Sequence, residues 1–406
     1  MRKFTFGGGI HPLSDMHEGK AETRGREVIA FAPDQVVIPM DMHLGAPSVP
    51  TVAKGDTVLL GQVIATPTGA RGIPVHASVS GTVSDVGMRQ LVGRAPSMCV
   101  VIDNDHRDEW VELTPLGTVE TSPADQIIPT IQQAGICGLG GACFPTHAKM
   151  TIPEGKVVDT LIINGAECET FLTADFRLML ETPERVVQGT RLAMRGMNVP
   201  RAIIAIEDNK PEAIDTMREA IKGQPGIELA VMKTKYPQGG EKYLISSLLK
   251  REVPSGGLPL DAHVVVLNVG TAAVISDAIL DGKPLTTRIV TVTGAVKTPS
   301  NLRVRIGTSI QDAVAFCGGY TEPPARIFFG GSMSGIAVPD DTMPITKANN
   351  GVVALTEKQA VLYEESPCIR CGRCVRACPA RLNPFQLNAV LDVNDDLVAA
   401  ERLHIA

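Results

Sequence analysis

Aromatic residues are scarce in this chain, and so are long apolar runs. Ten Phe, four Tyr and one Trp stand among 406 residues, against 39 Gly and 29 Pro. Such a composition indicates many tight turns and packing by small side chains. No apolar run approaches the roughly 18 residues of a membrane span, so any membrane attachment is expected to come through partners. The first residues, up to Gly9, lack the apolar core of a signal peptide.

The chain also lacks a basic patch with interleaved aromatic residues. Together with a formal net charge of −6, this argues against a nucleic-acid-binding protein. With 44% hydrophobic and 20% charged residues, the composition is that of a globular protein of two to four domains. The nine cysteines, four of them in one short motif, fit a reducing cytoplasm better than a disulfide framework.

That motif is the most informative segment of the sequence. Residues 368–379 read C-x2-C-x2-C-x3-C-P, the spacing with which one tight loop supplies thiolates to a 4Fe-4S cluster. A structural zinc site is the alternative, but it more often pairs two C-x2-C segments at a distance. The motif therefore predicts a protein that carries electrons, with these metal ligands: Cys368, Cys371, Cys374 and Cys378.

The end of the chain complicates this prediction. In two-cluster ferredoxins the fourth cysteine of such a run ligates the other cluster, yet the 28 residues after Cys378 contain no cysteine. Either Cys378 completes a single cluster, or the chain is cut before a second set of four cysteines. We expect the second case, in which the cluster is incomplete or absent in this chain.

Short apolar segments separated by glycines occupy residues 25–105. Segments 57–60, 61–65 and 75–83 are of this kind and predict a small β sandwich or barrel. Their pattern resembles the lipoyl/biotinyl barrel, which usually displays a modifiable lysine at a hairpin tip. The corresponding tip, residues 66–72, has no lysine. We therefore expect a structural or docking role rather than a swinging-arm carrier.

Strands and helices alternate from about residue 120 to 285. Continuous apolar runs predict strands buried on both faces at 159–163, 201–206 and 263–269. Helices are predicted from 182, from 210, over 240–251 and over 271–280, several with Pro just inside the start. This alternation predicts a Rossmann-like, mostly parallel α/β sheet.

A smaller unit follows. An alternating strand at 288–296, a helix at 310–317 and a strand at 326–330 resemble a β-grasp (SLBB-type) module. Residues 338–365, which carry Pro, Asn and Gly, are predicted to be a linker to the cysteine motif.

Four polar loops stand out in the α/β region. Gly138-Leu-Gly140-Gly141 could bring backbone N–H groups close to a phosphate, with Lys149 adding charge, although glycine clusters are usually turns. The strand at 159–163 runs into Asn164, Glu167 and Glu169, which suit the edge of an isoalloxazine and its ribityl hydroxyls; an exposed acidic turn is the alternative. The other two loops open helices, where N–H groups favour phosphate, at Gly239-Gly240-Glu241 and Asn268-Val-Gly270-Thr271.

At these residues the chain resembles the NADH-binding flavoprotein subunit of respiratory complex I and its hydrogenase relatives. There a "G-x-G-G-A-G-F-P" loop, an "N-A-D-E-S-E-P" strand end and a "G-E-E" helix start hold FMN and admit NADH. With the barrel in front and the cysteine motif behind, the order is similar to the C subunit of the Rnf/Rsx ion-translocating oxidoreductase over essentially the whole chain. The expected domains are 1–118 (lipoyl-like barrel-sandwich), 119–285 (FMN/NADH-binding), 286–337 (SLBB-type β-grasp), 338–365 (linker) and 366–406 (a ferredoxin-like helical module, incomplete).

The resemblance implies roles for particular residues. Near the flavin and its phosphate it places Gly138, Gly140, Gly141, Lys149, Asn268 and Thr271. Against the ring and ribityl chain it places Asn164, Glu167 and Glu169. Glu241, just after Gly240, is expected near the nicotinamide, and Phe144 against the adenine or in the core. The chain departs from the complex I pattern at Leu139, Cys143, Thr170 and Lys242. Cys137, Cys143 and Cys168 are expected to be isolated small core residues without a metal or redox role.

The resemblance implies the electron-input subunit of an ion-translocating complex, peripheral at the cytoplasmic face of the bacterial inner membrane. Electrons would pass between NADH and membrane partners through FMN and 4Fe-4S centres. Two alternatives remain: a soluble NADH diaphorase subunit of a hydrogenase-type complex, and a docking scaffold whose flavin site has decayed.

Overall fold

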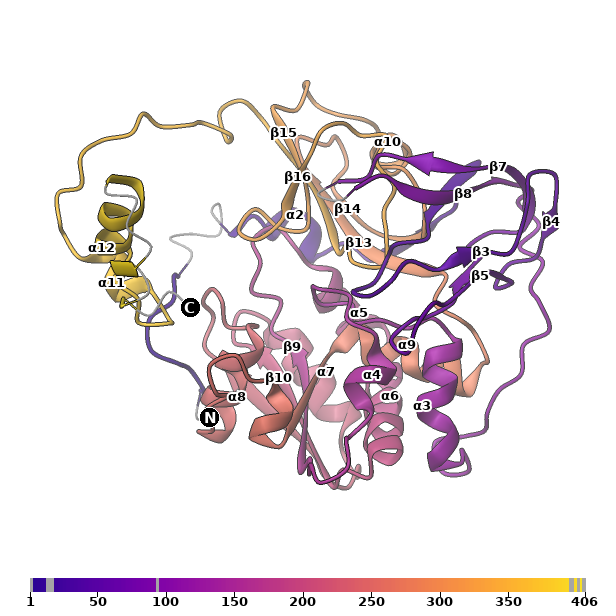
Figure 1. The fold of residues 1–406 in the computed structure, drawn as a ribbon, viewed down its shortest axis with the longest axis horizontal. Coiled ribbons are helices and arrows are strands. Elements are labelled where there is room, and N and C mark those ends of the chain that lie inside the picture. Colours follow the sequence, from indigo (N-terminus) through magenta and orange to yellow (C-terminus); the bar gives the residue numbers. More distant parts are fainter. Residues whose placement is uncertain (1–2, 12–17, 93–94, 394–397, 400–401, 404–406) are drawn as a thin grey trace.

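The computed structural model describes residues 3–11, 18–92, 95–393, 398–399 and 402–403. Figure 1 shows the barrel strands at one end of the molecule and the cysteine-bearing helices at the other. Between them lie an α/β unit and a further sheet. Among the helices of the described ranges, none combines the length and the apolar character needed to cross a bilayer.

The N-terminal strands form two antiparallel sheets, in the orders β2-β8-β7-β4 and β3-β5-β6. Their bounds are β2 Gln35–Pro39, β3 Val49–Pro50, β4 Thr57–Val58, β5 Val63–Thr66, β6 Val75–His76, β7 Gly81–Arg89 and β8 Ser97–Asn104. Apolar side chains such as Ile38, Val83 and Val100 are buried between them. A Cβ at Gly81 would lie 1.9 Å from the Asp103 carbonyl oxygen, so only glycine permits the approach of β7 to β8.

The α/β unit is a four-stranded parallel sheet in the order β11-β10-β9-β12. Its strands are β9 Thr160–Gly165, β10 Arg201–Glu207, β11 Ile227–Met232 and β12 Val264–Asn268. Their apolar runs are buried on both faces, as predicted. In this order β10 pairs with one edge of β9, and β12, which comes later in the chain, pairs with its other edge. The sheet therefore has a topological switch point between β9 and β12, where open α/β sheets bind ligands.

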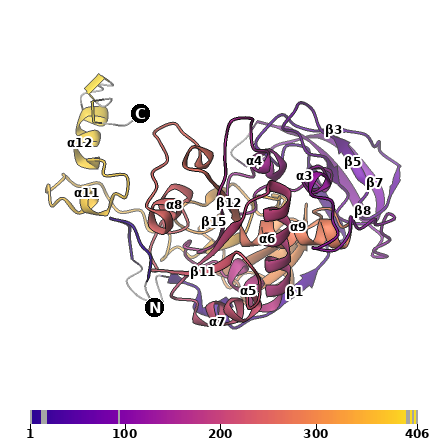
Figure 2. The same ribbon diagram turned by 90° about the horizontal axis from the view of Figure 1, so that it is seen from below.

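Helices cover both faces of this sheet. They are α3 Ala124–Gln133, α4 Thr146–Met150, α5 Ala174–Glu181, α6 Pro183–Met197, α7 Pro211–Ala220, α8 Glu241–Leu249 and α9 Val269–Leu280. Strand residues such as Ile163 and Ile204 share a core with α6 and α9, whereas Ile162 and Ile203 pack with α8. Figure 2 shows α8 apart from α6 and α9.

The remaining sheet is six-stranded, in the order β1-β14-β13-β17-β15-β16. The strands are β1 Val28–Phe31, β13 Thr287–Gly294, β14 Ser300–Arg305, β15 Arg326–Phe329, β16 Ile336–Val338 and β17 Gly351–Leu355, beside helix α10 Ile310–Phe316. Two expectations fail here. β1, expected in the barrel, pairs with β14, and the expected linker contains β17, which is buried along its whole length. The apolar run Val352-Val353-Ala354 explains the second difference, because it fills the gap between β13 and β15.

The cysteine-bearing segment forms the short helices α11 Arg373–Ala377 and α12 Pro384–Asn388, followed by a π turn over Ala389–Val393. Near the other end, α2 spans Ala21–Arg24, and a 3-10 turn spans Pro259–Ala262. Phe4 bridges to Met232 beside β11, and the Gly9 N–H donates to the Ala377 carbonyl at 2.8 Å. The N-terminal segment thus links the α/β sheet to the cysteine module (Figure 1).

Candidate functional site

A cleft of about 330 Å³ opens at the switch point of the parallel sheet. Asn164 at the end of β9 and Asn268 at the end of β12 lie side by side in the strand register. The structure brings together nine of the twelve predicted cofactor-binding residues as its lining: Gly138, Gly140, Gly141, Phe144, Lys149, Asn164, Gly240, Glu241 and Asn268. Gly239, Val266 and Leu267 also line it, and no sequence pattern singles out the last two.

The glycine loop forms one wall of this cleft. The Gly138 N–H donates to the Phe144 carbonyl at 2.8 Å, which closes the loop into a narrow turn. A Cβ at Gly140 would lie 3.0 Å from the Asn268 Cβ, so the loop backbone packs directly on the β12 end. A Cβ at Gly141 would meet nothing within 4 Å. The loop therefore offers bare backbone and open space to a ligand.

The two asparagines organise the neighbouring loops. The Asn164 amide donates to the Gly239 carbonyl at 2.9 Å and so fixes the turn before α8. Asn268 caps α9 by accepting from the Gly270 N–H at 2.8 Å, and its amide donates to Asp175 at 2.6 Å. Asp175 is buried at the start of α5, a contact that no local sequence pattern signals.

Lys149 and Glu241 face each other across the cleft. The Lys149 Nζ lies 2.5 Å from a Glu241 carboxylate oxygen, and the two side chains are 30% and 35% exposed. No side chain caps the start of α8 at Gly240. Uncapped helix N–H groups, which favour an anion, thus stand at the same edge of the cleft as the Lys149–Glu241 ion pair.

Three predicted residues do not line this cleft. Thr271 is buried, and its hydroxyl accepts from the Leu139 N–H at 2.9 Å, which anchors the glycine loop to α9. Glu167 caps α5, accepting from the Asp175 N–H at 2.7 Å and the Phe176 N–H at 3.2 Å. Glu169 accepts from two N–H groups of the β15–β16 turn. It lines a neighbouring cavity of about 370 Å³, which shares Gly140 and Gly141 with the cleft.

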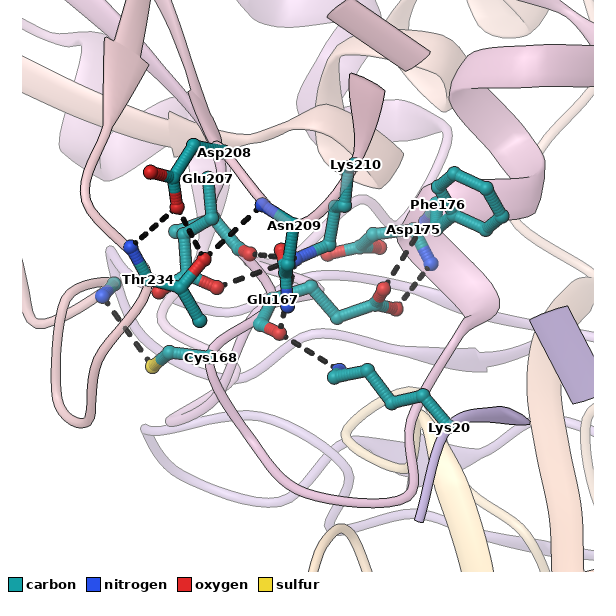
Figure 3. Close-up of polar contacts among 12 residues, drawn as sticks. Lys20, Glu167, Cys168, Asp175, Phe176, Glu207, Asp208, Asn209, Lys210 and Thr234 are labelled. Atoms are coloured by element: carbon teal, nitrogen blue, oxygen red, sulfur yellow. Dashed lines mark hydrogen bonds and ion pairs between the residues drawn. The ribbon is translucent and has the colours of Figure 1, made fainter. Parts of the chain in front are cut away.

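Behind the acidic loop, residues 166–173 between β9 and α5, lies a buried ionic network, shown in Figure 3. The Lys20 Nζ donates to the carbonyls of Glu167 at 2.9 Å and Leu172 at 2.5 Å. The Lys210 Nζ donates to the Ala166 carbonyl at 2.6 Å and to the Glu207 carboxylate at 3.2 Å. These two lysines hold the loop that follows β9. The sequence does not single out either lysine, because their partners lie far away along the chain or belong to no recognisable motif.

The carboxyl group of Glu167 is expected to make the free energy of unfolding depend on pH. Loss of solvation, the largest effect, outweighs the attraction of Lys20 and raises its pKa from the ordinary 4.5 to about 7. A carboxyl with a raised folded-state pKa contributes stability that is complete below pH 4.5 and is lost as the pH rises through about 7. Between these limits we expect the free energy of unfolding to fall more steeply with pH in the wild type than in Glu167→Gln.

Urea unfolding at a series of pH values measures this difference. Glu228→Gln is the matched control, because Glu228 is 60% exposed and pairs with Arg201 on the surface. Parallel pH profiles for the wild type and Glu167→Gln would contradict the prediction.

The four motif cysteines lie on and around α11. Cys368, Cys371 and Cys374 are exposed, and Cys378 is partly buried. Within the described residues, no three His, Cys, Asp or Glu side chains are gathered closely enough to hold a metal ion. The donor set, four thiols within one short segment, is nevertheless the one that a 4Fe-4S cluster requires.

An aromatic contact connects the N-terminal segment to the helix that borders the cleft. Phe6 stacks on Tyr243 of α8 with ring centroids 4.8 Å apart, and the Lys235 Nζ lies 3.7 Å from the Phe6 centroid. A Cβ at Gly8 would lie 3.0 Å from the Cys378 carbonyl oxygen. The cysteine module therefore rests near the same helix that begins with Glu241.

Comparison with known families agrees with this architecture. Residues 4–107 match the barrel sandwich hybrid domain described for RnfC, and residues 131–277 match the Nuo51 FMN-binding domain. Residues 289–337 match the SLBB domain, and residues 359–380 match a 4Fe-4S binding domain. A solved NAD+-reducing [NiFe]-hydrogenase in the H2-reduced state is similar with a TM-score of 0.50 and 22% identity, over 60% of this chain and 49% of that one. That likeness concerns the fold alone.

Whole-chain relatives are more specific. The C subunit of the proton-translocating ferredoxin:NAD(+) oxidoreductase complex of Clostridium ljungdahlii is 46% identical over 95% of this chain and 84% of its own length. The Na(+)-translocating counterpart from Acetobacterium woodii is 44% identical over 94% of this chain and 86% of its own length. The C subunit of the ion-translocating oxidoreductase complex of Serratia proteamaculans is 42% identical over 95% of this chain and 55% of its own.

The fold and these matches define an electron-transfer flavoprotein with an FMN-binding domain and a 4Fe-4S binding region. The chain belongs to the RnfC family, the C subunits of the ion-translocating ferredoxin:NAD+ oxidoreductase (Rnf) complexes. The predicted family and the predicted multidomain fold class are thereby confirmed.

Proposed function

We propose that the switch-point cleft holds FMN and admits NAD(H). The observation that carries this proposal is the convergence of four separate chain segments on one cleft: the glycine loop, the β9 end, the β12 end and the α8 start. Bound FMN would supply the conversion between a hydride and single electrons. The chain's part is to present bare backbone at Gly141, a cation at Lys149 and uncapped N–H groups at the start of α8.

NAD(H) is proposed as the second ligand on two grounds. The relatives are described as ferredoxin:NAD(+) oxidoreductases. Phe144 lines the cleft as an aromatic surface, with the Arg71 guanidinium 5.9 Å from its ring centroid. Glu241 stands opposite Lys149 at the cleft edge, where it would meet the nicotinamide end.

The four motif cysteines are proposed to be 4Fe-4S ligands in a path that passes electrons to other subunits of a membrane complex, with Cys378 either completing the cluster of the other three or ligating a second one. The match of this segment to a 4Fe-4S binding domain supports the ligand set. The N-terminal segment and α8 place the motif on the side of the α/β unit where Glu241 stands. We infer a peripheral position at the cytoplasmic face of the inner membrane.

Titration of the purified chain with FMN, followed by NADH under anaerobic conditions, tests the proposal. We expect saturable quenching of flavin fluorescence, and then bleaching of the flavin absorption band when NADH is added. Absence of flavin binding would overturn the proposed site and would favour the scaffold alternative. Flavin binding without bleaching would overturn the assignment of NADH.

Lys149→Gln is expected to weaken FMN binding about ten- to hundredfold. A hydrogen bond from a charged donor contributes about 1.5–3 kcal/mol, and every 1.4 kcal/mol is roughly tenfold in affinity. Fluorescence titration measures the dissociation constant. Lys156→Gln is the control, because Lys156 is 49% exposed and pairs with Asp261 away from the cleft lining. Equal affinities of the two variants would contradict a phosphate contact at Lys149.

A further inference from the structure

Two cysteines flank the glycine loop and face each other. The Sγ atoms of Cys137 and Cys143 lie 3.2 Å apart, and both residues are buried. The bridge between Cys137 and Pro145 and the hydrogen bond from Gly138 to Phe144 hold the two ends of the loop together. The expectation that Cys137 and Cys143 are isolated is therefore wrong. The turn of the folded loop brings them together, and the sequence alone does not reveal that turn.

Two buried cations surround this thiol pair. The Lys347 Nζ donates to the Gly135 carbonyl at 2.7 Å, and Arg288 donates to the Leu139 carbonyl within the loop. Both cations are almost fully buried, and both act electrostatically on the two sulfurs. Hydrogen bonding to Cys143 first, and then these charges, lower the pKa of Cys137 despite its burial. Thiolates react more readily than thiols, so this environment favours sulfur chemistry.

We propose that Cys137 and Cys143 form a reversible disulfide in response to a peroxide, which makes the glycine loop a modification site. One thiolate attacks a peroxide oxygen, so that an S–O bond forms, the O–O bond breaks and hydroxide leaves. The second thiol then attacks this sulfur, so that the S–S bond forms, the S–O bond breaks and water leaves. The hydroxide takes up the proton that the first thiol released on ionising, so that two thiols and one hydrogen peroxide give one disulfide and two waters.

Little movement is required. A disulfide has an S–S distance of about 2.05 Å, so the sulfurs must approach by only about 1 Å. Cys143 lines the cleft although it is only 1% exposed, so a peroxide would reach the pair from the cleft side. Because the loop is the cleft wall, the disulfide would reshape the space beside Gly140 and Gly141 and weaken ligand binding there. This last consequence rests on the proposed FMN function.

Peptide mapping tests disulfide formation without any bound cofactor. The reduced full chain is treated with hydrogen peroxide, quenched with N-ethylmaleimide under denaturing conditions and digested with trypsin. Residues 108–149 contain no internal Lys or Arg and hold only these two cysteines. We expect this peptide to be unalkylated and lighter than its reduced form by two hydrogens, whereas buried Cys99 and Cys317 become alkylated.

Cys137→Ser and Cys143→Ser each remove the mass change, and Cys317→Ser leaves it intact. Alkylation of both Cys137 and Cys143 after peroxide treatment would overturn the proposal, as would cross-links from either of them to other cysteines.

A second measurement separates this proposal from the proposed function. FMN affinity is compared before and after peroxide treatment, in the wild type and in Cys137→Ser, which controls for oxidation elsewhere. We expect a loss of affinity of about tenfold in the wild type alone, equivalent to about 1.4 kcal/mol. Disulfide formation with unchanged FMN affinity would overturn the effect on the cleft. No FMN binding by the reduced chain would instead be a failure of the proposed function.

Discussion

Replacing Lys210 with methionine is expected to lower the free energy of unfolding by about 3–5 kcal/mol. The Lys210 and Glu207 side chains are only 2% and 1% exposed, and their charged atoms lie 3.2 Å apart. Without the ammonium, the Glu207 carboxylate stays buried with less compensation, and the Ala166 carbonyl loses its donor at 2.6 Å. Urea unfolding followed by circular dichroism measures the change.

A surface lysine provides the control for this prediction. Lys222 also pairs with a glutamate at 2.6 Å, but both side chains are more than two-thirds exposed. Lys222→Met is expected to change stability by no more than about 0.5 kcal/mol. The double variant Glu207→Leu/Lys210→Met should recover part of the loss, because no unpaired charge then remains buried. A loss below about 1 kcal/mol in Lys210→Met would contradict the structural role of the pair.

The parallel sheet and its cleft can be predicted from the sequence because local sequence patterns encode both of them. Continuous apolar runs identify β9, β10 and β12, and the polar residues that end them must meet at one edge. Asn164 and Asn268 illustrate this, since adjacent parallel strands placed them in register. The pairing of β1 with β14, in contrast, joins segments about 270 residues apart, and no local pattern encodes it.

The acidic loop shows a feature that local sequence patterns do not predict, the placement of its side chains. Glu167 and Glu169 follow a strand that points to the cleft, which made both of them candidates for it. In the structure Glu167 has a φ of +47°, and the chain turns there so that its carboxylate caps α5. The Glu169 carboxylate accepts a hydrogen bond from the β15–β16 turn, which belongs to another domain. The course of this loop thus depends on Lys20 and Lys210, which bond its backbone carbonyls, and the direction of the Glu169 side chain depends on Ser334; the local sequence contains none of these partners.

Gly189→Ala is expected to destabilise the α/β unit by about 2 kcal/mol. A Cβ at Gly189 would lie 1.6 Å from the Ala272 carbonyl oxygen and 2.5 Å from its carbonyl carbon, so α6 and α9 meet backbone to backbone. An added methyl must separate the helices, and overpacking of this kind costs about 1–3 kcal/mol or more. The helix propensity of alanine offsets only about 1 kcal/mol of this. Because the cleft residue Asn268 caps the start of α9, the strain also reaches the cleft.

Gly196 of the same helix is the matched comparison for this substitution. A Cβ at Gly196 would lie 2.9 Å from the Ile127 Cγ2 and 3.1 Å from its Cβ, a much milder overlap than the 1.6 Å between a Cβ at Gly189 and the Ala272 carbonyl oxygen. Gly196→Ala is therefore expected to be clearly more stable than Gly189→Ala in urea unfolding. Gly25→Ala, with a φ of −84° and no atom within 4 Å of its Cβ, should be neutral. Equal stabilities of the Gly189 and Gly196 variants would show that α6 and α9 are not in close backbone contact, and the cleft would then lack the rigid support that the structure gives it.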